Sequence, residues 1–423
     1  METTLHRRAV QRILSDRLDE APVVRLSGPR AAGKTTSCVA EITRRGGSIV
    51  PLDDPEVRDA VAADAKGYLS GLPPPILVDE YQRVPLVLDV IKTSLLGSRG
   101  RSGGWLLSGS VSIQTVAQAA ETFGGRLNDV AMGTLSLDER NDLPEPTFLA
   151  RLLDQGPTCL RGWRPTPPLG RDELLSEAVR GGFPLVADRG AAAARRRGLE
   201  DWVNASVIAD GAAVGGIRNT EGLRRMLRLY AAATASVTPK DRPLADQLGI
   251  DRRTVASYRD LLTGLYVIWD LPAFLPGNAT GQVLRSPKLH IVDSGLAAFL
   301  AGRDQPSSLG RDPGFTGSLI ETMVANDLRV QATVHPDSPR LLHYREESHE
   351  VDLVVERYDG TAFGIEVKLA SNPGDGDLGG LRRLRRSSGS RWGGGVLLCR
   401  VPVGRITHDD IAVAPLETVW SSE

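Results

Sequence analysis

The segment GPRAAGKT at residues 28–35 constrains the fold of this chain more than any other feature. It matches the pattern G-x-x-x-x-G-K-[ST] at every fixed position, follows the apolar run PVVRLS and precedes a helical pattern. Its glycines let backbone N–H groups curl around phosphate oxygens, and the start of the following helix favours an anion. Lys34 is expected to reach the β- and γ-phosphates of ATP, and Thr35 to offer its hydroxyl to Mg²⁺. The predicted nucleotide-binding residues are Gly28, Pro29, Arg30, Ala31, Ala32, Gly33, Lys34, Thr35 and Thr36.

A second apolar strand, ILVDE, ends in two acidic residues. Asp79 is expected to hold the Mg²⁺ with its water shell, and Glu80 to orient and deprotonate the attacking water. The alternative is a solvated turn, which the nearby phosphate-binding loop makes less attractive. The next strand ends in SGS at residues 108–110, where a polar side chain could sense the γ-phosphate. Arg126 is either an arginine finger for a neighbouring subunit or a surface arginine, and the surface interpretation is slightly favoured.

The order of strands and helices predicts an α/β protein with several domains. Strands alternate with helices over residues 1–140, which predicts a parallel sheet with helices on its faces. Residues 141–170 contain six prolines and are interpreted as a loop-like linker. Residues 171–300 are expected to be helical and to include a winged helix-turn-helix, and residues 301–423 return to mixed α/β structure.

The helix-turn-helix pattern runs from Pro243 to Leu271. Leu244–Leu248 would form the first helix, Gly249 the turn and Arg252–Leu262 the second helix, with the following strands as a wing. In DNA-binding versions the second helix enters the major groove. A winged helix that serves only for packing remains the alternative. The residues that could face phosphates or bases are Arg252, Arg253, Thr254, Ser257 and Arg259.

Acidic residues and a lysine recur in the C-terminal region. Glu366 follows Asp352 by fourteen positions, Lys368 shares a strand face with Glu366, and Glu321 lies on an amphipathic helix upstream. Carboxylates suit Mg²⁺, so Glu321, Asp352 and Glu366 are candidate metal ligands. Asp352, Glu366 and Lys368 are candidate catalytic residues for phosphodiester cleavage. The alternative is a solvated salt-bridge face. The apolar neighbours argue against it, because they indicate that these strands are largely buried, and buried charge is costly unless it is paired or bound to metal.

Composition excludes several classes of protein. The chain has 51 basic and 52 acidic residues, which argues against a generally basic nucleic-acid coat protein. Three distant cysteines form neither a disulfide framework nor a zinc site. No long apolar run or signal peptide is visible, so a cytoplasmic protein without a membrane partner is expected. Lysine is rare, and a lysine that remains can be one that arginine cannot replace. The six lysines are Lys34, Lys66, Lys92, Lys240, Lys288 and Lys368.

Two resemblances follow from these motifs. The C-terminal constellation resembles the PD-(D/E)XK nuclease core, and its flanks resemble archaeal Holliday-junction resolvases. Most of the chain resembles a prokaryotic family of AAA-type P-loop ATPases with a C-terminal domain of unknown function. The matching stretches are LSGPRAAGKTT, ILVDEYQRVP, LLSGS, FGGRL, GGFPLV, SPKLHIVDSGLAAFL, GSLIETMVANDL and HEVDLVVE with GIEVKLA.

The family resemblance implies a P-loop NTPase sheet domain, a winged-helix middle and a nuclease-like C-terminal domain. It implies ATP binding at residues 28–36, Mg²⁺ held through Thr35 and Asp79, and hydrolysis assisted by Glu80. Ala31 departs from the family, which tends to have glutamine there. The favoured hypothesis is a Mg²⁺-dependent ATPase acting on nucleic acid, with DNA preferred. The alternative is a nucleotide-gated switch whose nuclease-like domain is inactive, and a homo-oligomer is left open.

Overall fold

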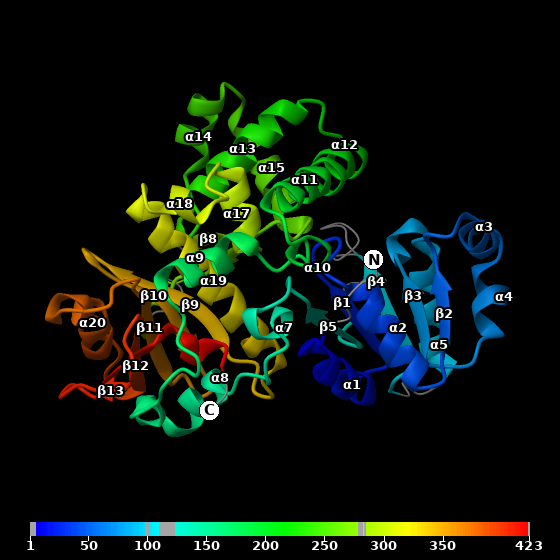
Figure 1. The fold of residues 1–423 in the computed structure, drawn as a ribbon. Helices are drawn as coiled ribbons and strands as arrows, with labels where there is room; N and C mark the ends of the chain where they lie inside the picture. The colour runs from blue at the N-terminus through cyan, green and yellow to red at the C-terminus, as the bar shows by residue number, and fades with distance from the viewer. Residues whose placement is uncertain (1–5, 98–101, 110–122, 278–281, 283–284, 422–423) are drawn as a thin grey trace.

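We describe the fold from a computed structural model of the chain, in which residues 6–97, 102–109, 123–277, 282 and 285–421 are described. Figure 1 shows an N-terminal sheet domain at the right, a C-terminal sheet domain at the lower left, and a layer of helices above them. The long helix α19 (Pro313–Val334) runs between them and contacts elements of all three. None of the helices in the described ranges combines the length and apolar character that a membrane crossing requires.

The N-terminal sheet is parallel, as the alternation of strands and helices predicted. Its strands lie in the order β2-β3-β4-β1-β5. Helices α1 (Val10–Glu20) and α2 (Lys34–Arg44) bury their apolar stripes against one face, and α3 (Pro55–Ala63), α4 (Ala65–Ser70) and α5 (Leu86–Gly97) cover the other. The phosphate-binding loop follows the inner strand β1, so it lies at the carboxyl edge of the sheet. The strands are β1 (Val23–Ser27), β2 (Ser48–Pro51), β3 (Ile76–Asp79), β4 (Trp105–Gly109) and β5 (Leu127–Ala131).

The proline-rich segment 141–170 is not the loop-like linker that its composition predicted. After α7 (Leu137–Arg140) the chain forms α8 (Phe148–Gln155) and a short 3₁₀ turn, η2 (Pro157–Leu160). Helix α8 buries Leu149 and Leu152 against α19 and the C-terminal domain. The apolar positions of one short amphipathic helix therefore outweigh the prolines, which lie outside it.

The middle region is helical and ends in a small antiparallel sheet. Two of its helices, α14 (Asp241–Leu248) and α15 (Arg252–Gly264), lie where the sequence predicted a helix pair, and Gly249 adopts a left-handed φ of 66° between them. The sheet order is β6-β8-β7, with β6 (Ser236–Val237), β7 (Ile268–Leu271) and β8 (Lys288–Ile291). The remaining helices are α9 (Arg171–Arg180), α10 (Pro184–Ala187), α11 (Ala192–Val203), the π-helical η3 (Asn204–Ala209), α12 (Asp210–Gly215), α13 (Thr220–Ala232), α17 (Ser294–Leu300) and α18 (Pro306–Leu309).

The C-terminal domain is a mixed sheet with strand order β13-β14-β12-β11-β10-β9. Apolar residues of α19 pack on one face, and α20 (Gly379–Ser388) buries Leu381 and Leu384 on the other. Strand β11 is antiparallel to β10 and parallel to β12, so acidic residues on β10 and β11 are neighbours beneath α19. The strands are β9 (Arg340–Glu346), β10 (His349–Glu356), β11 (Ala362–Val367), β12 (Trp392–Cys399), β13 (Arg405–Ile406) and β14 (Ile411–Pro415).

Candidate functional site

The loop between β1 and α2 has the conformation that its glycines predicted. Gly28 adopts φ 154° and Gly33 φ 96°. A Cβ atom on Gly28 would lie 2.1 Å from the carbonyl oxygen of Met132, so only glycine fits there. The ammonium of Lys34 donates hydrogen bonds to the carbonyl oxygens of Gly28 and Pro29, at 2.9 and 2.8 Å. The lysine side chain is therefore held inside the loop.

Beside this lysine lies a pair of oxygen groups suited to a divalent cation. The hydroxyl of Thr35 donates to Oδ2 of Asp79 at 2.9 Å, which brings together the start of α2 and the carboxyl end of β3. The other carboxylate oxygen of Asp79 is buried and has no hydrogen-bond partner among the described atoms. A buried carboxylate oxygen without a partner is unfavourable, and Mg²⁺ prefers such ligands. These two residues therefore fit the metal that the sequence predicted.

Glu80 lies next to this pair at the start of a 3₁₀ turn. It adopts φ 53°, a left-handed conformation that is uncommon for a residue with a side chain. Its carboxylate accepts a hydrogen bond from the amide of Gln82. Burial lowers the pKa of Lys34 to about 8, although the charges of Glu80 and Asp79 oppose this shift. The site therefore combines a cation and two carboxylates at one edge of the sheet.

A cavity of about 300 Å³ opens over the loop. The predicted residues Arg30, Ala31, Gly33, Lys34, Thr35, Thr36 and Glu80 line it. Its other walls come from segments that motif analysis did not identify, and these include His6, Gln11, Pro184 and Leu185. His6 bonds to Asp188 through Nε2 at 3.0 Å, which joins the N-terminal segment to the middle region. No local sequence signal marks these residues, because the chain brings them together over more than 170 positions.

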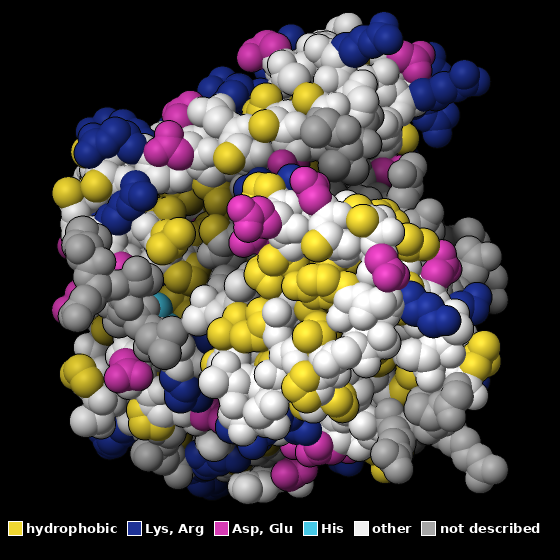
Figure 2. Space-filling model, turned by 90° about the vertical axis from the view of Figure 1, so that its right-hand side faces the viewer, with side chains coloured by type: hydrophobic (Ala, Val, Ile, Leu, Met, Phe, Trp, Pro, Cys, Tyr) yellow, Lys and Arg dark blue, Asp and Glu magenta, His cyan; other side chains and the backbone are white. Residues whose placement is uncertain are grey.

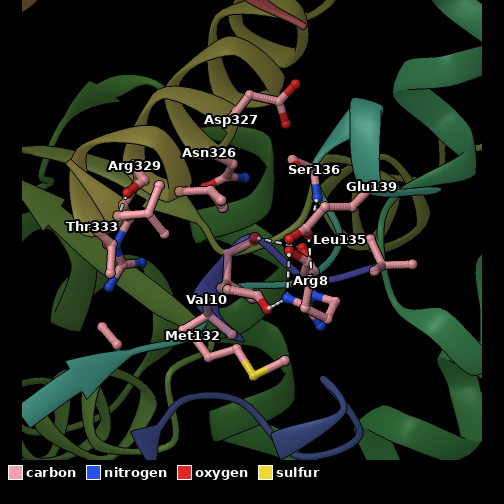
Figure 3. Close-up of a pocket in the computed structure, with 16 residues that line it drawn as sticks. Arg8, Val10, Met132, Leu135, Ser136, Glu139, Asn326, Asp327, Arg329 and Thr333 are labelled. Atoms are coloured by element: carbon pink, nitrogen blue, oxygen red, sulfur yellow. Dashed lines mark hydrogen bonds and ion pairs between the residues drawn. The ribbon is translucent and has the colours of Figure 1, made fainter. Parts of the chain in front are cut away.

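Arg8 fastens the back of the loop to the rest of the protein. Its guanidinium donates to the carbonyl oxygens of Ala32 and Gly133 and lies 3.1 Å from the carboxylate of Glu139. Figure 3 shows Arg8 and Glu139 on one wall of a small cavity, with Asp327 and Arg329 of α19 on the other. The loop is thus connected through one arginine to the region where the N-terminal sheet meets α19.

The helical layer also contacts the loop directly. The indole nitrogen of Trp202 on α11 donates to the carbonyl oxygen of Arg30 at 2.9 Å, and the guanidinium of Arg30 lies 3.0 Å from Asp210 on α12. The π-helical segment η3 (Asn204–Ala209) separates these two contacts along the chain. π-Helical segments are rare in proteins, and those that occur are often found at functional sites. One loop residue therefore receives two contacts from opposite ends of an irregular helix.

Other predicted residues have different positions. Ser108 is fully buried on β4, beside Asp79 in the strand register, whereas Ser110 lies outside the described residues. Arg126 is exposed and precedes β5, so it lies at the amino edge of the parallel sheet, opposite the loop. An exposed arginine at this edge is compatible with both interpretations of Arg126, because a finger for a neighbouring subunit would be exposed as well.

The predicted nucleic-acid face of α15 is divided. Arg252, Arg253 and Ser257 are exposed, and Thr254 is partly exposed. Arg259 instead points inward, where it donates to the hydroxyl of Tyr230 at 3.1 Å and forms an ion pair with Asp241. Arg259 is therefore removed from the predicted contact face, because it holds α13, α14 and α15 together.

Two of the predicted C-terminal acidic residues, Glu321 and Asp352, lie beside a lysine that the sequence analysis had not placed there. Lys288 on β8 reaches beneath α19, and its side chain is 1% exposed. Its Nζ lies 2.8 Å from Glu321, 2.6 Å from Glu350 and 3.2 Å from Asp352. Burial disfavours the charged ammonium, but the three carboxylates outweigh that penalty and raise the pKa of Lys288.

The second lysine of the cluster pairs with the strand glutamate. Nζ of Lys368 lies 2.6 Å from Glu366. Burial, together with the charge of Asp352, raises the pKa of Glu366 to about 8, and burial likewise raises the pKa of Glu321. Within the described ranges, no group of three or more His, Cys, Asp or Glu side chains is arranged to hold a metal ion. The predicted metal set of Glu321, Asp352 and Glu366 is therefore corrected, because an ammonium lies between its members.

Three family models match consecutive parts of the chain. Residues 20–141 match an AAA domain, residues 171–307 a domain of unknown function (DUF8612), and residues 316–418 another domain of unknown function (DUF4143). The chain thus combines an N-terminal AAA-type P-loop ATPase domain with two further domains whose functions their families do not define.

The chain is also similar to individual proteins. Uncharacterized proteins of Mycobacterium tuberculosis and Mycobacterium bovis are each 28% identical over 382 residues, which cover 87% of this chain and 75% of theirs. Among solved structures, a Walker-type ATPase of Pyrococcus abyssi is 14% identical with a TM-score of 0.42, over 69% of this chain and 94% of that one. RuvB of Thermotoga maritima is 17% identical with a TM-score of 0.30, over 62% and 89%.

Proposed function

We propose that this protein is a Mg²⁺-dependent ATPase that works as a nucleotide-gated switch. The observation that carries the proposal is the buried Asp79 oxygen without a partner, beside the Thr35 hydroxyl and the Lys34 ammonium. Lys34 and Thr35 line a cavity whose wall also includes Glu80. The match of residues 20–141 to an AAA domain supports the same function.

Each residue of the site has a defined task in this proposal. Mg²⁺ bound with ATP supplies positive charge that offsets the phosphates, and Thr35 and Asp79 would hold it. Lys34 exchanges its bonds to loop carbonyls for bonds to phosphate oxygens, and the backbone N–H groups of the loop bind the same anion. Glu80 orients a water molecule and accepts its proton.

The proposed switch depends on the contacts that Arg30 makes with the helical layer. Trp202 and Asp210 hold the backbone and the side chain of this loop residue, and the π-helical η3 lies between them. A loop that adapts to nucleotide must move against α11 and α12 or carry them along. The helical layer is therefore the first part of the protein to respond to ATP binding or hydrolysis.

ATP binding and hydrolysis by the full chain test this proposal, with Lys34→Ala, Glu80→Gln and the exposed Lys66→Ala as variants. We expect Lys34→Ala to lose binding and hydrolysis together. Glu80→Gln should keep binding and lose about 10²–10⁴-fold in kcat, because it removes a general base. Lys66→Ala should match the wild type. A wild-type chain that binds no ATP in the presence of Mg²⁺ would overturn the proposal.

A nucleic-acid ligand is a second candidate, favoured by the exposed start of α15. Arg252 and Arg253 are exposed there, and Figure 2 shows further Lys and Arg side chains, mixed with acidic ones, at the upper end of the molecule. DNA binding that weakens with salt and is reduced in Arg252→Ala/Arg253→Ala would support this ligand, with RNA as the comparison. Binding that this double variant leaves unchanged would exclude α15 as the contact.

Nuclease activity is not included in the proposed function. Glu366, Asp352 and Glu321 lie near Lys368, and their charges raise its pKa against the effect of burial. However, the ammonium of Lys288 lies among the carboxylates that would have to bind the metal. The alternative of an inactive nuclease-like domain is therefore the better supported one.

A further inference from the structure

The carboxylate cluster of the C-terminal domain contains a cation that belongs to the chain itself. An ammonium group has three hydrogen-bond donors, and Nζ of Lys288 lies within 3.2 Å of three carboxylates. These carboxylates belong to Glu321, Glu350 and Asp352. Lys288 comes from the middle region, whereas its partners lie on α19 and β10, so the cluster forms only where the two domains meet.

The strand that carries Lys288 is fixed against α19 by its neighbours. His290 lies two residues further on the same face of β8 and stacks on Trp269, with ring centroids 4.8 Å apart. The indole nitrogen of Trp269 donates to Asn326 on α19 at 2.9 Å. The ammonium is thus directed into the cluster by a packed strand and does not depend on a flexible side chain alone.

The carboxylates of the cluster outnumber its ammonium groups. One oxygen of Asp352 accepts from the backbone N–H of Val367 at 2.9 Å, and Glu366 pairs with Lys368. The second oxygen of Glu366 is buried, and no described atom bonds to it. Four carboxylates, counting Glu321 and Glu350, therefore share two ammonium groups, and removal of Lys288 would leave a single cation among them.

We propose that Lys288 is the resident cation of this cluster, that it keeps divalent metal ions out of the C-terminal domain, and that its removal turns the cluster into a divalent-cation site. Carboxylate oxygens are the preferred ligands of Mg²⁺ and Mn²⁺, so the donor set left without the ammonium is chemically suitable. The inference concerns the C-terminal domain and stands apart from the proposed ATPase function.

Mn²⁺ titrations without nucleotide test the inference, read by calorimetry and by the electron paramagnetic resonance of free Mn²⁺. The proteins are the full-length wild type, Asp352→Asn, Lys288→Met, Lys288→Met/Asp352→Asn and the surface control Lys66→Met. Methionine has a length close to that of lysine and no charge. The Asp352→Asn substitution separates binding at the cluster from binding at Thr35 and Asp79.

We expect the wild type and Asp352→Asn to bind Mn²⁺ equally, which means that the wild type has no Asp352-dependent site. Lys288→Met should gain about one Mn²⁺ per chain, and the double variant should lose it. Mn²⁺ should also raise the melting temperature of Lys288→Met by more than that of Lys66→Met, in which only the site at Thr35 and Asp79 is present.

Two results would overturn the inference. One is an Asp352-dependent Mn²⁺ site in the wild type, and the other is a folded Lys288→Met chain that gains no Mn²⁺. If Lys288→Met is recovered only when it is refolded with Mn²⁺, that requirement supports the inference, provided that the double variant does not recover. Lys288→Gln keeps hydrogen-bond donors but not the charge. If Lys288→Met does not fold either with or without Mn²⁺, the same titrations are made on Lys288→Gln, with the same expected result.

Discussion

Replacement of Lys288 by methionine should destabilise the interface of the middle and C-terminal domains strongly. The substitution keeps most of the side-chain volume but removes a buried ammonium that lies 2.6–3.2 Å from three carboxylates. Removal of one partner of a buried ion pair costs about 3–5 kcal/mol, because the other partner is left buried and unpaired. For a cooperative unit of about 150–250 residues, each kcal/mol corresponds to roughly 2–4 °C, so a loss of about 6–20 °C in Tm is expected.

The loss should depend on pH. Without the ammonium, burial raises the pKa values of the cluster carboxyls in the folded variant. The same carboxyls have ordinary pKa values in the unfolded chain, so they bind protons more readily in the folded state. The free energy of unfolding then falls as pH rises, because the folded state holds more protons than the unfolded state. Glu366, whose pKa is already raised to about 8, and Glu321 belong to this set. The deficit of Lys288→Met relative to the wild type should therefore be larger near pH 8 than near pH 5.5.

Thermal unfolding followed by circular dichroism at both pH values measures this deficit, in a buffer without divalent cations. Lys66→Met, which replaces an exposed lysine on α4, is the matched control and should unfold with the wild type. A Lys288→Met chain that unfolds within about 2 °C of the wild type near pH 8 would refute the electrostatic reasoning. So would an equal deficit at both pH values, because loss of packing alone does not titrate.

Three further predictions concern packing and the nucleotide site. Leu152→Ala should lower the free energy of unfolding by about 3–5 kcal/mol, because Leu152 is fully buried. Gln155→Ala, which replaces an exposed residue of the same helix, should leave that free energy unchanged. Equal free energies of unfolding for the two variants in denaturant titrations would restore the linker interpretation. Gly28→Ala should abolish ATP binding in a fluorescent-nucleotide assay, because its methyl group would meet the Met132 carbonyl, and retained binding would contradict that clash. Asp79→Asn should weaken ATP binding in Mg²⁺ but change it little in EDTA, and an equal loss in both would assign Asp79 a structural role.

The features predicted correctly from the sequence are those whose determinants lie close together along the chain. The loop glycines, Lys34 and Thr35 belong to one octapeptide, and Asp79 ends β3, whose carboxyl end lies at the same edge of the parallel sheet as that of β1. The determinants of the two helices around Gly249 are also local, because the glycine turn and the spacing of apolar residues define both helices.

The features that sequence analysis missed depend on contacts between distant segments. Trp202 reaches Arg30 across 172 positions, and no motif marks either residue for that contact. Lys288 was visible only as one of six lysines in an arginine-rich chain, yet this scarcity was a usable signal. A compact ammonium with three donors fits among three carboxylates where a planar guanidinium would not. The prolines of 141–170 predicted a loop, whereas the amphipathic pattern of Phe148–Gln155 between them determines the helix that forms.

The position of Lys288 affects how this protein should be dissected. A fragment that begins at residue 316, where the second domain of unknown function starts, keeps Glu321, Asp352 and Glu366 but lacks β8 and its lysine. Such a fragment would expose uncompensated anionic charge on the face that α19 shares with the middle region. Metal affinity or weak cleavage measured on it would be a property created by truncation. Assays of the C-terminal domain therefore need β7 and β8 as well, that is residues 268–418, because Trp269 on β7 helps to fix the strand that carries Lys288.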